Sequence, residues 1–171
     1  MENTLERQFL AFSCTKLREL ASRIDVCMAA LSSEQVWKRG GENENAIGNL
    51  VLHLCGNVRQ WIIAGLGGEP DARQRSAEFT AQGGVGAVEL REKLNETVSR
   101  AVAVIEGVVA AELLRHRNIQ GYEVSGLEAI YHVVEHFSMH TGQIIFAAKA
   151  VTGADFGFYR ELSGTGRRET A

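Results

Sequence analysis

The sequence predicts an all-α protein, a four-helix bundle with one long crossover between its second and third helices. Three observations indicate this class. Only one proline, Pro70, occurs in the 171 residues, so nearly the whole chain is free to be helical. Four segments repeat apolar residues at the three- and four-residue spacing of an amphipathic helix. One long and one medium connection join them, as four-helix bundles allow.

Apolar periodicity places the four long helices over residues 3–31, 45–66, 87–109 and 125–153. Each segment carries a row of apolar residues at helical spacing with polar or charged residues between them. A capping-box pattern predicts an additional short helical piece over residues 32–40. These assignments leave little of the chain for strands.

The connecting segments differ in character. Residues 69–85 are polar and contain glycine, and we expect them to form a long surface crossover. Residues 113–126 alternate in polarity around Gly121, which indicates either an extended segment or a poor hairpin. We expect residues 1–155 to form one bundle domain and residues 156–171 to form a C-terminal tail whose last eight residues are loose.

Composition excludes several classes of protein. Apolar residues make up 45% and charged residues 23%, the balance of an ordinary globular chain. A net charge of −3 without a basic stripe argues against nucleic-acid binding, and no apolar run is long enough for a membrane span. The amino end lacks the apolar core of a secretory signal. Cysteines without a CxxC pattern indicate reduced core thiols in a cytoplasmic protein, namely Cys14, Cys27 and Cys55.

Three of the five histidines occur at positions 132, 136 and 140 of the fourth predicted helix. Residues four apart lie on one helix face, one turn from each other, so His136 and His140 can direct their rings at one ion. A third ligand has to come from another helix, and His53 lies in the middle of the second helix, where it has no capping role. Bundles build metal sites from facing helices. The pattern therefore allows a metal site, but by spacing alone it fits ordinary core or surface histidines at least as well.

The sequence also gives interpretations for the other polar residues near these histidines. His132 points furthest from the apolar row of its helix, about 150° around the axis, so we interpret it as a surface residue or a neighbour of the site. Asn57 either faces the site or belongs to a polar seam. Gln143 and Glu135 are candidate contacts of a ligand or substrate, with a surface position favoured for Glu135. Cys55 should point away from the site.

Two motifs resemble those of the DinB-like superfamily of metal-binding helical proteins. The stretch EHFSMHTGQI is similar to its last-helix signature, and NLVLHLCGNVRQWI is similar to its second-helix pattern of a histidine, an asparagine and an aromatic residue. The polar crossover and the helix order extend the resemblance over most of residues 5–152. It implies an up-down-down-up bundle that holds one divalent ion, zinc or nickel, through His53, His136 and His140.

The resemblance also implies a function. Several members of the superfamily are thiol-dependent transferases or isomerases, and many are homodimers. We therefore expect a homodimeric metal-dependent enzyme, either a transferase that activates a low-molecular-weight thiol for transfer to a small electrophilic substrate or a hydrolase. Three neutral histidines leave the ion an open position, as in catalytic rather than structural sites. The alternative expectation is a metal-binding bundle without catalysis, with a role in stress response or protein interaction.

Overall fold

The computed structural model describes residues 4–159, and over this range the chain is mostly helical, as the sequence predicts. Seven α-helices, one π-helical turn and one two-stranded hairpin follow one another in the described part. None of the helices within it is both long and apolar enough to cross a membrane. Most of the predicted tail, including its last eight residues, lies outside the described residues.

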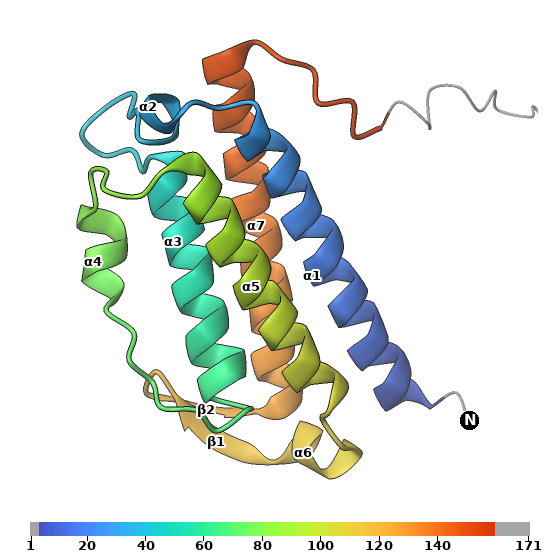
Figure 1. Cartoon of the computed structure of the whole chain (residues 1–171). Coiled ribbons are helices and arrows are strands. Elements are labelled where there is room, and N and C mark those ends of the chain that lie inside the picture. Colours follow the sequence, from blue (N-terminus) through green and yellow to red (C-terminus); the bar gives the residue numbers. More distant parts are fainter. Residues whose placement is uncertain (1–3, 160–171) are drawn as a thin grey trace, which may run out of the picture.

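Four long helices lie side by side (Figure 1): α1 (Leu5–Ala29), α3 (Ile47–Val58), α5 (Ala87–Glu106) and α7 (Gly126–Thr152). Helix α1 packs against α5 and α7, and α3 packs against the same two helices. Each helix turns its apolar row inward, which removes that surface from water. The fully buried side chains include Leu17, Ile24, Leu54, Leu90, Leu94, Ile105, Ile130, Phe137 and Ile144.

Local sequence explains where α7 begins and ends. The Ser125 hydroxyl accepts a hydrogen bond from the Glu128 N–H, and the Glu128 carboxylate accepts one from the Ser125 N–H at 2.7 Å. This reciprocal capping box satisfies two free donors at the helix start. Gly153 closes the helix with a φ of 67°, a left-handed conformation that glycine adopts without steric cost. The short helix α2 (Ser33–Val36) also begins with a capping box.

The predicted second helix changes its geometry part-way along. Helix α3 continues directly into η1, a π-helical turn over Arg59–Ala64. Turns of this kind are rare and often occur at functional sites. Trp61 lies in the turn, is buried, and donates a hydrogen bond from Nε1 to Gln120 at 3.1 Å. The π-helical turn therefore connects α3 to the segment before α7.

That segment forms a hairpin, one of the two possibilities that the sequence leaves open. After the short helix α6 (Ala110–Leu114), strand β1 (His116–Ile119) pairs antiparallel with β2 (Tyr122–Ser125). The two turn residues, Gln120 and Gly121, have φ values of 56° and 85°. Both lie in the left-handed region, as the favoured two-residue hairpin turns require.

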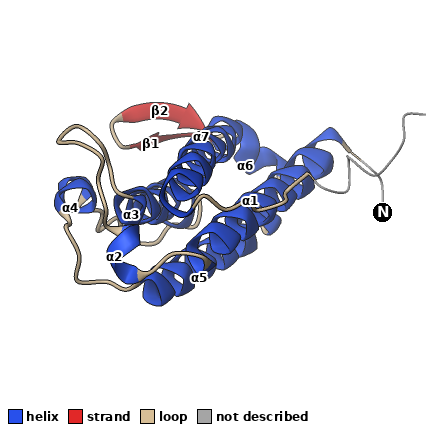
Figure 2. Cartoon of the chain, turned by 90° about the horizontal axis from the view of Figure 1, so that it is seen from above, coloured by secondary structure: helices blue, strands red, loops and turns tan. Residues whose placement is uncertain are grey.

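The crossover is more than a surface segment. It contains α4 (Arg75–Thr80), which packs on α3 on the side away from α1 (Figures 1 and 2). The fully buried Asn49 of α3 holds it, because its Nδ2 donates to the backbone carbonyls of Glu78 and Ala81, each at 2.9 Å. The predicted surface position is wrong for Glu78, which is buried. Helix α4 is too short for its apolar periodicity to indicate whether it packs against the bundle or lies in solvent.

Candidate metal centre

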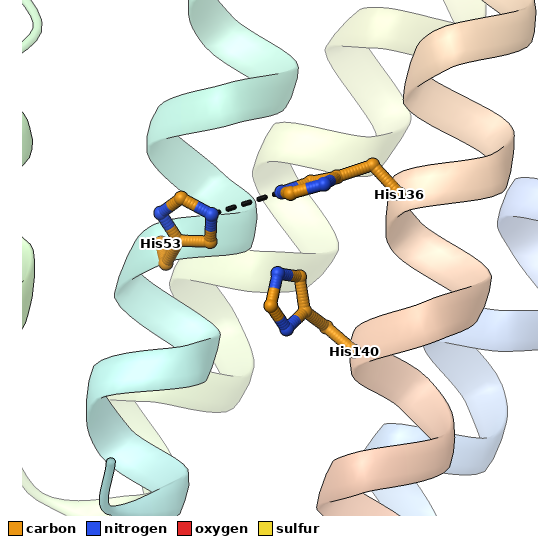
Figure 3. A group of neighbouring side chains, drawn as sticks. All are labelled: His53, His136 and His140. Atoms are coloured by element: carbon orange, nitrogen blue, oxygen red, sulfur yellow. Dashed lines mark hydrogen bonds between the residues drawn. The ribbon is translucent and has the colours of Figure 1, made fainter. Parts of the chain in front are cut away.

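Helices α3 and α7 bring three histidines together (Figure 3). His53 points from α3 toward α7, and His136 and His140 point back from successive turns of α7. One ring nitrogen of each lies within 4.8 Å of the others, and the Nε2 atoms of His53 and His136 are 2.9 Å apart. His53 and His140 are buried, and His136 is half-buried. The structure thus places side by side the three side chains that the sequence predicts as ligands.

The positions of the nitrogens fit a divalent transition-metal ion. Imidazole binds zinc at about 2.0–2.1 Å, so two ligand nitrogens of one ion lie at most about 4.2 Å apart. The separation between His53 and His136 already meets this condition, and the third nitrogen needs only a small side-chain adjustment. Imidazole suits zinc, nickel, copper and iron, so the donor set is compatible with metal binding.

Two of the histidines form hydrogen bonds through their Nδ1 atoms, which point away from the centre of the cluster. Glu78 Oε2 lies 3.0 Å from Nδ1 of His53, and Gln143 Oε1 lies 2.7 Å from Nδ1 of His140. A carboxylate oxygen and an amide oxygen only accept hydrogen bonds, so each Nδ1 carries the proton and each Nε2 keeps its lone pair. Metal-binding histidines are usually fixed in this way.

Arg73 holds Glu78 in place. Its Nε and Nη2 donate to the two carboxylate oxygens at 2.8 and 2.9 Å, and the two side chains are only 4% and 10% exposed. Arg73 Nη2 also lies 3.1 Å from His53 Nδ1, but two donors do not bond each other. Burial acts to raise the pKa of Glu78, but the hydrogen bonds from Arg73 and His53 outweigh burial and lower this pKa. The carboxylate is therefore ionised at neutral pH.

The surroundings of His136 and His140 favour their neutral forms. Burial, together with the neighbouring histidines and Arg73, lowers the pKa of His136 to about 3. Burial also lowers the pKa of His140, although its hydrogen bond to Gln143 acts in the opposite direction. Neutral imidazole is the form that binds a metal ion. His136 and His140 therefore need to lose no proton to bind a metal ion near pH 7.

A second polar pair lies next to the cluster. Asn57 is buried, and its Nδ2 lies 3.3 Å from Nε2 of His132. The His132 ring packs against Trp61 and His136, with ring centroids 4.0 and 5.4 Å apart. His132 is thus a half-buried neighbour of the cluster, one of the two positions that the sequence allows. Glu135 is exposed, as favoured.

Sequence reasoning missed Glu78 and Arg73. Both belong to the crossover, where the stretch DARQRSAEF looks like any solvated polar loop. The single available signal is an arginine and a glutamate five residues apart, and such pairs are common on surfaces. Cys55 does not belong to the cluster, and burial raises the pKa of its thiol to about 11.

The chain matches a family model and is similar to solved structures. The model of a family described as "Protein of unknown function (DUF1572)" matches residues 4–163. Among solved structures, the chain is similar to one described as "Crystal structure of the conserved protein of locus from Enterococcus faecalis", with a TM-score of 0.70 and 13% identity over 84% of this chain and 97% of that one. At this identity the likeness shows the fold alone. No curated protein matches the sequence.

Proposed function

The chain belongs to the DUF1572 family, and we propose that it is a metal-dependent enzyme that activates a low-molecular-weight thiol at a centre made by His53, His136 and His140. One observation carries the proposal. Glu78 and Gln143 accept the Nδ1 protons of His53 and His140, so each Nε2 keeps its lone pair. The Nε2 of His53 faces the Nε2 of His136 at 2.9 Å. This arrangement favours a bound cation over a cluster that merely packs.

The donor set favours chemistry over a structural role. Three neutral imidazoles fill three positions and leave at least one open, as in catalytic zinc sites. A divalent ion, zinc or nickel, supplies Lewis-acid activation when bound, which raises the thiolate fraction of a thiol near pH 7. His136 is half-buried whereas His53 and His140 are buried, and we propose that a small molecule reaches the centre beside His136.

The proposed reaction is S-transfer to an electrophilic carbon. The thiol loses its proton to solvent, its sulfur forms a bond to the carbon, and the leaving group departs with the electrons of the broken bond. The protein contributes position, since Glu78 and Gln143 fix two of the three rings before any ligand arrives. A metal-binding protein without catalysis is the second candidate, supported by the same cluster.

Elemental analysis of purified protein tests the metal centre. We expect about one equivalent of zinc or nickel in the wild type and loss of metal in His53→Ala, His136→Ala and His140→Ala. His116→Ala is the matched control, because His116 is an exposed histidine of β1. Equal metal content in all five proteins would show that the assignment is wrong.

Turnover separates the two candidates. The zinc-loaded protein is mixed with a panel of small thiols and 1-chloro-2,4-dinitrobenzene, and formation of the thioether is followed by absorbance. We expect faster product formation with the loaded than with the metal-free protein, for at least one thiol. Equal rates for every thiol favour the non-catalytic candidate.

We also propose that the chain shares the up-down-down-up helix order of the DinB-like superfamily. Figure 1 supports this order, because α1 and α7 run toward the end where α2 lies and α3 and α5 run away from it. The bundle domain over residues 1–155, the homodimer and the cytoplasmic location are part of the same proposal. Sedimentation of the purified chain tests the dimer.

A further inference from the structure

Asn57 is a buried amide that its neighbours do not satisfy. It is 4% exposed, and its Oδ1 has no hydrogen-bond partner among residues 4–159. The fold thus leaves one buried polar atom unpaired, which is destabilising and calls for an explanation.

The contact that Asn57 does make is weak and easily exchanged. Its Nδ2 lies 3.3 Å from Nε2 of His132, longer than an ordinary N–H hydrogen bond. Asn57 follows His53 by four residues and His132 precedes His136 by four, so the pair forms the next layer of the same seam between α3 and α7. His132 is half-buried, so part of its side chain reaches solvent beside the buried amide.

The hairpin turn contacts the residue that packs on His132. Trp61 packs on the His132 ring and donates its indole N–H to the side chain of Gln120. Gln120 has a φ of 56°, a conformation that a residue other than glycine adopts rarely and at an energetic cost. The hydrogen bond to the turn therefore fixes the orientation of the Trp61 indole, and packing against the indole limits the orientations of the His132 ring.

We propose that Asn57 and His132 form a hydrogen-bonding subsite for an uncharged amide group of the thiol that binds at the histidine cluster. The inference rests on the proposed function. An amide and an imidazole offer hydrogen bonds without a fixed charge, so they suit a neutral group that both donates and accepts better than a carboxylate or an ammonium. One helical turn, about 5.4 Å, separates the subsite from the cluster. A sulfur and an amide joined by two methylene groups span about that distance.

Two thiols that differ in the amide test the subsite. The cobalt(II)-loaded protein is titrated with N-acetylcysteamine and with 1-butanethiol, and binding is followed by the sulfur-to-cobalt charge-transfer band. We expect the wild type to bind the amide-bearing thiol about tenfold more tightly. In Asn57→Leu and His132→Phe this ratio should fall to about one, with unchanged binding of 1-butanethiol.

Asn95→Leu alters an exposed asparagine of α5 and should keep the wild-type ratio. A ratio unchanged in Asn57→Leu and His132→Phe overturns the subsite. Loss of cobalt from His132→Phe also overturns it, because His132 would then be a ligand.

A measurement without metal separates this inference from the proposed function. If the wild type binds neither cobalt nor thiol, the proposed function fails, and thermal unfolding of the metal-free protein still tests the amide. Asn57→Leu and Asn57→Met should melt at the wild-type temperature or above it, because each removes an unsatisfied buried group. A lower melting temperature in both variants shows that the fold itself satisfies the amide, and overturns the subsite.

Discussion

Gly56 of α3 leaves the space in which the carboxyl group of Glu78 lies. A methyl group on Gly56 would lie 2.7 Å from the carboxyl carbon of Glu78 and 3.0 Å from Nε of Arg73, too close for either contact. Gly56 follows His53 by three residues, so one face of α3 carries both the histidine and the room for its acceptor. Glycine inside a helix costs about 1 kcal/mol relative to alanine, and here it allows α4 to approach.

Gly56→Ala should therefore weaken zinc binding by about tenfold or more. The added methyl group displaces Glu78, and His53 then loses the acceptor that fixes its Nδ1 proton. Competition against a chromophoric chelator measures the dissociation constant of zinc.

Gly142→Ala is the matched control for this substitution. Gly142 lies on the exposed face of α7, and a methyl group there meets nothing within 4 Å. The control should raise the free energy of unfolding by about 0.5–1 kcal/mol without any change in zinc affinity. A Gly56→Ala protein that behaves like this control would show that the space beside Gly56 has no role in holding Glu78.

Glu78→Gln should reduce both stability and zinc affinity. Arg73 would become a buried cation without its carboxylate, and loss of one partner of a buried pair costs about 3–5 kcal/mol. Zinc affinity should fall by about 10–100-fold, the usual effect of changing a residue that orients a metal ligand. Urea unfolding of the metal-free protein and chelator competition give the two numbers.

Glu69→Gln provides the comparison, because Glu69 pairs with Arg100 at the surface, where the side chains are 45% and 38% exposed. Its effect on the free energy of unfolding should stay within about 1 kcal/mol. Equal effects of the two substitutions would mean that Glu78 is an ordinary surface acid.

Short-range spacing explains what the sequence predicts well. Apolar rows place the long helices, and a four-residue interval places His136 and His140 on one face of α7. The start of α7 at Ser125 follows from a cap that involves only neighbouring residues. The approach of His53 depends on packing, but the apolar rows of α3 and α7 already indicate that these helices face a common core.

The missed features depend on contacts between distant segments. Glu78 reaches His53 because Asn49 binds the backbone of α4. The spacing of apolar residues does not predict the contact between Asn49 and α4. The unpaired amide of Asn57 becomes visible only when the residues opposite it are known. Gln120 adopts a left-handed conformation that its residue type disfavours. Gly121 was therefore the only one of the two turn residues whose type indicated a hairpin turn.

The metal-free protein should lose stability as the pH falls below about 6.5. His136 takes up a proton near pH 6.5 when unfolded but only near pH 3 when folded, because burial and the other histidines lower its pKa to about 3. Between these values the unfolded state binds one proton more, so acid favours unfolding, by at most about 1.4 kcal/mol per pH unit for this group. Urea unfolding at several pH values between 7.5 and 4.5 measures the slope.

His136→Gln should flatten that slope, and His116→Gln on the exposed strand β1 should leave it unchanged. A slope that is identical in all three proteins would contradict a histidine held neutral in the cluster.

Two substitutions of Gln143 should change the zinc affinity in opposite directions. Its Oε1 accepts the Nδ1 proton of His140 at 2.7 Å, so the acceptor strength at this position should tune the ring as a zinc ligand. Gln143→Glu replaces the amide oxygen with a carboxylate, a stronger acceptor, and should tighten zinc binding. Gln143→Leu removes the acceptor and should weaken it, by less than Glu78→Gln because Gln143 is exposed. Chelator competition at pH 7.5 ranks the three proteins, and any order other than glutamate, glutamine, leucine is incompatible with an orienting role for Gln143.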